Sequence, residues 1–136
     1  MDLMNSLHVA ASGLRAQAGR MRVIAENLAN SGSTAQTKGG DPYRRKIPTF
    51  EVEFDRNLQV PLVKSGRIQV DKSDFSLRYD PNHPAANDKG YVKFPNVNPL
   101  IETMDMREAQ RSYEANLNVI TTTRRILSRT LEILRV

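Results

Sequence analysis

The sequence predicts a mainly α-helical protein with a small β-rich insert. Both ends of the chain repeat apolar residues at heptad spacing, and glycine and proline concentrate in the middle. With 136 residues and no cysteine, the chain has at most one domain's length and no disulfide framework. We expect residues 1–30 and 99–136 to form an antiparallel coiled hairpin, and residues 31–98 to form an extended β-hairpin arm.

The first predicted helix covers residues 3–30. Steps of alternately four and three residues reach eight positions, of which seven are apolar: Leu3, Leu7, Ala10, Leu14, Gln17, Met21, Ile24 and Leu28. Asp2 or Ser6 can cap its start. The helix should end at residues 30–32, Asn-Ser-Gly, which tolerate the left-handed conformation that closes many helices.

The second predicted helix covers residues 99–134. Asn98 can cap it, and Pro99 occupies the first turn, where proline costs nothing. The same steps reach ten positions, seven of them apolar if the tyrosine is counted: Thr103, Met106, Gln110, Tyr113, Leu117, Ile120, Arg124, Leu127, Leu131 and Leu134. The polar residues in both seams can fix the register between helices at some cost in stability.

The middle of the chain, residues 31–98, holds five of the seven glycines and six of the seven prolines, so a helix is improbable there. Apolar residues alternate instead at 50–54, 67–70 and 90–94, which predicts short strands of a small hairpin or sheet. Pro61, Gly66 and the turn-forming residues 80–84 should separate these strands.

Each predicted helix carries a second apolar stripe beside the first. In the first helix it comprises Met4, Ala11, Ala18 and Ala25, and in the second Val119, Ile126 and Ile133. A two-helix hairpin covers one stripe on each partner, so the other is expected to drive association, and the ends of an isolated chain should be largely disordered. The alternative is that both stripes line an ordinary helical bundle, but the middle segment supplies no further helices for one.

The residues give no support for catalysis, a metal site or a cofactor. His8 and His83 have no partner at ligand spacing, and the loop that begins at Asp80 has proline and alanine where a calcium loop needs a ligand and a glycine. The net charge of +5 leaves one alternative open, a small basic helical protein that binds nucleic acid. Acidic residues follow the basic cluster at 44–46 closely, which favours a solvated or salt-bridging role over nucleic-acid binding.

The cluster Tyr43, Arg44, Arg45 and Lys46 is a candidate contact between subunits, because arginine forks pair well with carboxylates on a neighbour. The alternative is a solvated loop. No stretch is apolar enough to span a membrane, and the N-terminus lacks the pattern of a secretory signal, so we expect neither direct membrane insertion nor the general secretory route.

Several motifs resemble the axial rod and hook proteins of the bacterial flagellum. Residues 25–30, AENLAN, resemble that family's N-terminal signature, and further similarity to its proximal-rod members lies in residues 39–46, 79–84, 90–92, 95–98 and 111–116. The resemblance covers nearly the whole chain in order. It implies a non-enzymatic structural subunit of the basal-body rod, which polymerises to transmit torque and to form the export channel.

The resemblance also implies partners and a location. Such subunits are exported unfolded through the flagellar type III apparatus without a cleaved signal, and they assemble in the periplasm with copies of themselves, other rod proteins, and ring and rod-adaptor components. On this basis the first helix should pack through Leu7, Leu14, Met21, Ile24 and Leu28. The second should meet it through Leu117, Ile120, Leu127 and Leu131, with Tyr113 anchoring the middle.

Overall fold

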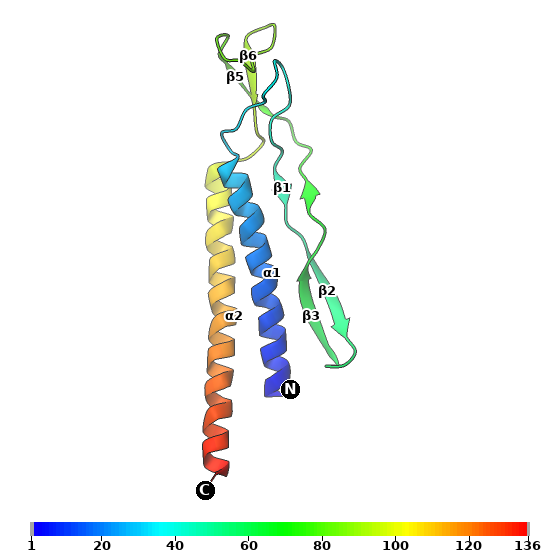
Figure 1. Cartoon of the computed structure of the whole chain (residues 1–136), viewed down its shortest axis with the longest axis vertical. Coiled ribbons are helices and arrows are strands. Elements are labelled where there is room, and N and C mark those ends of the chain that lie inside the picture. The colour runs from blue at the N-terminus through cyan, green and yellow to red at the C-terminus, as the bar shows by residue number, and fades with distance from the viewer. Residues whose placement is uncertain (1, 136) are drawn as a thin grey trace. The chain divides into compact units, whose positions relative to one another are not determined.

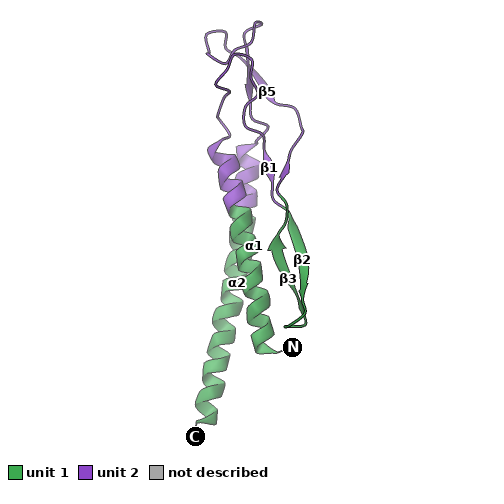
Figure 2. Ribbon diagram, turned by 45° about the vertical axis from the view of Figure 1, so that its right-hand side comes forward, with its two compact units in different colours: residues 1–21, 49–67, 107–136 green, residues 22–48, 68–106 purple. Residues whose placement is uncertain are grey.

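The computed structural model describes residues 2–135 and confirms the predicted fold class. Helix α1 (Leu3–Ala29) and helix α2 (Pro99–Leu134) enclose six short strands in the sequence (Figure 1). Contacts divide the chain into two compact units (Figure 2). Unit 1 comprises residues 1–21, 49–67 and 107–136, and unit 2 comprises residues 22–48 and 68–106. The division into residues 1–30, 31–98 and 99–136 remains a prediction from the sequence.

The helix starts follow the sequence signals. Asp2 Oδ1 accepts a hydrogen bond from the Met4 amide at 3.3 Å, and Asn98 Oδ1 accepts one from the Leu100 amide at 3.0 Å. The expected left-handed end of α1 is wrong, because no residue from 30 to 32 has a positive φ. Instead, successive turns continue past the helix, and Ser31 Oγ donates to the Leu28 carbonyl at 2.8 Å.

The strands form three separate antiparallel pairs. They are β1 (Lys46–Ile47) with β4 (Gln69–Val70), β2 (Phe50–Asp55) with β3 (Val60–Ser65), and β5 (Ser76–Tyr79) with β6 (Tyr91–Phe94). Strands were predicted at the positions of β2, β4 and β6, whereas β1, β3 and β5 were not expected. Pro61 lies inside β3, opposite Phe54, and does not separate strands as predicted. A two-stranded pair tolerates proline, since each strand is an edge and needs hydrogen bonds on one side only.

In unit 1, α1 and α2 run antiparallel in close contact. A Cβ atom on Gly13 would lie 2.9 Å from the side chain of Asn116, and seven residues further along α1, Arg20 pairs with Glu108 of α2 at 3.4 Å. The β2–β3 pair lies along α1, where the Val63 amide donates to Ser12 Oγ at 3.2 Å. Its turn is closed by Asp55 Oδ1, which accepts two backbone amides.

Unit 2 has a small apolar core beneath the β5–β6 pair. Val92 is fully buried against Ala85 and Ala86, and Phe94 packs on the same cluster. The turn predicted at residues 80–84 connects the two strands, and Gly90 adopts a φ of 81°, which favours glycine. In residues 2–135, neither helix has a stretch apolar and long enough to cross a membrane.

Candidate assembly site

The predicted packing residues are unequally covered in a single copy. Of α1, Ile24 is buried, and the rest are half-buried: Leu7, Leu14, Met21 and Leu28. Of α2, Tyr113, Ile120 and Leu127 are half-buried, whereas Leu117 and Leu131 are exposed. Their packing against one another, or against a neighbouring subunit, remains a prediction.

The residues that α2 buries are small or polar, and sequence reasoning missed them. Buried or half-buried positions recur every seven residues at Glu102, Ala109, Asn116 and Thr123. In unit 1, this row brings the Asn116 side chain against Gly13, where a Cβ atom would lie 2.9 Å from its amide group. The heptad period is visible in the sequence, but the apolar residues that reveal it stand at neighbouring positions of the helix and not at the buried ones.

The second apolar stripe of α2 is exposed in unit 1. Val119 is 46% exposed, Ile126 45% and Ile133 74%. On α1, Met4 is also exposed, as are Ala18 and Ala25, whereas Ala11 is half-buried. An exposed row of large aliphatic side chains is a strong drive toward association, since each one buried contributes about 1.5–3 kcal/mol.

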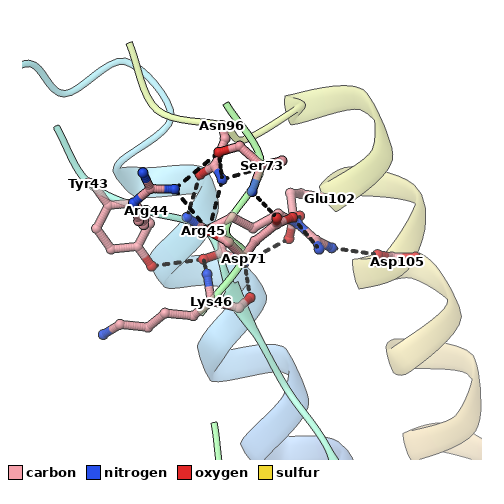
Figure 3. A network of polar contacts seen from close by, with 10 residues as sticks. Tyr43, Arg44, Arg45, Lys46, Asp71, Ser73, Asn96, Glu102 and Asp105 are labelled. Carbon is pink, nitrogen blue, oxygen red and sulfur yellow. Dashed lines mark hydrogen bonds and ion pairs between the residues drawn. The ribbon is translucent and has the colours of Figure 1, made fainter. Parts of the chain in front are cut away.

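Unit 2 contains a buried ion pair at the start of α2. Glu102 is 1% exposed, and its Oε1 atom pairs with Arg45 Nε (Figure 3). Two further carboxylates, of Asp71 and Asp105, each lie 3.8 Å from the same guanidinium. A buried carboxylate is costly unless it is paired and hydrogen-bonded, so Arg45 is what allows a glutamate at this position.

Asn27, buried near the end of α1, uses all its hydrogen-bonding capacity in this network. Its Oδ1 atom accepts from the Tyr43 hydroxyl at 2.8 Å and from the Lys46 amide at 2.9 Å. Its Nδ2 atom donates to the Lys46 carbonyl at 2.8 Å and to Glu102 Oε2 at 3.1 Å. Asn27 therefore joins α1, the segment before β1, and α2 through a single side chain.

Arg44 and Asn96 fasten the segment around residues 71–75 to the same network (Figure 3). Arg44 NH1 donates to the Ser73 carbonyl at 3.0 Å, and its guanidinium lies over the Phe75 ring, 4.1 Å from the centroid. Asn96 accepts from the Arg45 amide at 2.8 Å and donates to the Asp71 carbonyl at 3.1 Å. The side chains of Arg44 and Asn96 thus hold residues 71–75 against the segment that precedes β1.

The predicted cluster Tyr43, Arg44, Arg45 and Lys46 is engaged within its own chain. In addition to the bonds above, Lys46 Nζ pairs with Glu26 of α1. All four residues are half-buried, so they form an internal anchor that neither alternative from the sequence had described. A contact between subunits through these residues remains a prediction.

The network shifts two pKa values in directions that follow from its geometry. Burial, reinforced by the carboxylates of Glu26 and Glu102, raises the pKa of the Tyr43 phenol to about 12. Hydrogen bonds from Ser73, helped by the arginines at 44 and 45, hold the pKa of Asp71 below its usual value. The two shifts favour a neutral phenol on Tyr43 and an ionised carboxylate on Asp71.

Comparisons with known proteins cover nearly the whole chain. Residues 88–133 match the family described as flagellar basal body rod FlgEFG protein C-terminal. The chain is 51% identical to the flagellar basal-body rod protein FlgC of Agrobacterium fabrum, over 93% of this chain and 91% of that one. It is 42% identical to the FlgC of Aquifex aeolicus over 97% of each chain. With the FlgC of Bacillus subtilis it shares 41% identity, over 98% of this chain and 99% of the relative.

Proposed function

The chain belongs to the FlgC family of flagellar basal-body rod proteins, and we propose that it builds the proximal part of the rod. It is a structural subunit of the basal body. The observation that supports polymerisation most directly is the exposed apolar row on α2 in unit 1, at Val119, Ile126 and Ile133. The alternative of a nucleic-acid-binding protein has nothing in its favour.

We propose copies of this chain, other rod proteins, and ring and rod-adaptor components as its neighbours. Subunits held together in this way would transmit torque and enclose the export channel. The strand pairs of residues 31–98 would contact adjacent subunits as an arm. We further propose export through the flagellar type III apparatus, on the basis of the chain's membership of the FlgC family.

The direct test removes the gene and restores it with substituted versions. Deletion should abolish swimming and leave basal bodies without a complete rod. Leu14→Asp or Leu127→Asp should fail to restore them, because each places an unpaired charge in the apolar seam predicted between the two helices. Thr121→Asp, on an exposed position of α2, is the matched control and should restore swimming.

Normal swimming of the deletion strain would contradict the proposed rod function. Normal swimming of both seam variants would contradict the predicted packing of the helices. A density map of the basal body would then assign each neighbour.

A further inference from the structure

The β2–β3 pair, called the ribbon below, has an apolar row that is largely exposed in unit 1. Phe50, Val52 and Phe54 alternate along β2 and therefore point to one side, and they are 44%, 72% and 56% exposed. The ribbon contacts α1 at Ser12 through the amide of Val63 on the β3 edge, which leaves β2 as the outer strand. A large apolar face of this kind on a soluble subunit marks an interaction surface.

Strand β2 is also acidic. Glu51, Glu53 and Asp55 alternate with the apolar residues of β2, and only Glu53 among them has an ion pair in residues 2–135, with Lys64 at 3.0 Å. A partner that covers the apolar face would therefore gain from carrying cationic side chains long enough to reach around the free edge of β2.

The exposed stripe of α2 is apolar and is flanked by long cationic side chains. Ile126 and Ile133 stand about 10.5 Å apart along the helix, and Phe50 and Phe54 about 13 Å apart along the strand, so the row on the ribbon is long enough to cover two successive residues of the stripe. Arg129 lies between the two isoleucines, three residues after the first and four before the second, and Arg125 lies one turn before it. Both arginines are exposed, and neither has an ion pair in the described part of the chain.

These observations point to a second copy as the occupant. We propose that the apolar face of the ribbon docks on the stripe Val119, Ile126 and Ile133 of a second copy, with Arg125 and Arg129 facing the acidic residues of β2. In a single copy the stripe and the apolar row of the ribbon are both exposed, so one copy does not satisfy both surfaces. Two different, complementary surfaces on one chain give head-to-tail association, which generates rings or helical filaments. This inference rests on the proposed rod function and specifies a contact within it.

Cross-linking tests the contact without interference, since the chain has no cysteine of its own. Val52→Cys and Ile126→Cys are introduced into separate full-length copies of distinguishable mass, which are mixed and oxidised. A mixed disulfide dimer is expected, because a disulfide requires Cα atoms within about 7 Å. The matched control pairs Val52→Cys with Thr121→Cys, which is exposed on another side of α2 and should cross-link far less. Equal yields with both partners, or no mixed dimer, would overturn the proposal.

Charge reversal gives a second readout that does not depend on disulfide geometry. Arg129→Glu should lower the association constant about tenfold, and Glu51→Arg in the partner copy should recover most of the loss. Arg124→Glu, the same charge change on the other flank of α2, is the control and should have little effect. Equal losses for the two arginine variants, or no recovery, would contradict the proposal.

Experiments on isolated basal bodies distinguish a failure of the proposed contact from a failure of the proposed rod function. If Val52→Cys, carrying a photoreactive group on its thiol, cross-links there to a different rod protein and never to a second copy, the occupant proposed here is wrong while the rod function stands. If deletion of the gene leaves rods and swimming intact, the rod function itself fails.

Discussion

In unit 2, the side chains of Asn27, Arg45 and Glu102 satisfy one another in a buried network, whereas in unit 1 the two helices meet through Gly13 and Asn116 and leave aliphatic rows exposed. The first arrangement is complete within one chain, since its buried polar groups have partners. The second leaves apolar surface that only another molecule can bury. From this difference we expect the polar network of unit 2 to form within one chain, and the helix contact of unit 1 to gain stability on assembly.

The largest expected effect is a contrast in amide exchange between the two units of the isolated chain. The amides of Arg45 and Lys46, bonded to the buried network, should exchange at least about a hundredfold more slowly than those of residues 5–15 in α1. In unit 1, α1 buries mainly small side chains such as Ala10 and Ala16, which contribute little apolar area, so this part of the helix should open readily. Hydrogen exchange followed by NMR or mass spectrometry measures this. Strong protection across residues 3–20 in a monomer would show that unit 1 needs no partner.

Next in size is the loss of the buried carboxylate in unit 2. Glu102→Ala should lower the free energy of unfolding of this unit by about 3 kcal/mol, because it leaves the Arg45 guanidinium without its nearest partner. Glu108→Ala removes an exposed partner of Arg20 in unit 1 and should cost less than about 1 kcal/mol. Urea unfolding followed by circular dichroism compares the two variants. Equal effects would mean that the network contributes no more than a surface ion pair.

A smaller effect is expected from filling the close helix approach in unit 1. Gly13→Ala improves helix propensity, but its new methyl group would lie 2.9 Å from the Asn116 side chain, so a net loss of about 1 kcal/mol is expected. Adding Asn116→Ala should restore stability by removing the clash. Gly32→Ala, where a Cβ meets nothing within 4 Å, is the control. Thermal melting compares these three variants with the wild type. A higher melting temperature for Gly13→Ala alone would contradict the tight contact between Gly13 and Asn116.

The smallest effect is a dependence on high pH in unit 2. The folded pKa of Tyr43, about 12, exceeds the usual value of 10.0, so the stability from the neutral phenol is complete below pH 10 and is lost as the pH rises toward 12. Tyr43→Phe should be less stable than the wild type at pH 8, by about 1 kcal/mol, because Asn27 loses a donor. Above pH 10 the difference should shrink. A constant difference from pH 8 to 12 would show that the phenol does not titrate in the folded state.

The helices were predictable within one residue at each end because their signals are local. Asn98 and Pro99 mark the start of α2 through hydrogen bonding and ring geometry, and the heptad pattern extends each helix to its observed end. The strand at β3 was missed because Pro61 is normally excluded from sheets. Proline is tolerated in an isolated pair of strands, because the amide that it lacks can face away from the partner strand, where no hydrogen bond between the strands is lost.

The candidate site was only partly predictable because its key contacts join distant positions. The sequence singled out Arg45 as part of a basic cluster, but nothing local indicates that its partner is Glu102, fifty-seven residues away. Asn27 lies inside a recognised motif, yet its four hydrogen bonds depend on two other segments. The exposure of Val119, Ile126 and Ile133 was expected from periodicity, since two apolar stripes exceed what one neighbouring helix covers.

The hydrogen bond between Asn27 and Glu102 spans seventy-five residues of chain, which has a consequence for the order of folding. A chain that emerges gradually from one end, whether from the ribosome or from a narrow channel, exposes one of these side chains long before the other. The network therefore cannot close until most of the polypeptide is free. The bonds from Asn27 to Tyr43 and Lys46 can form early, whereas the bond to Glu102 closes a long loop and therefore forms late.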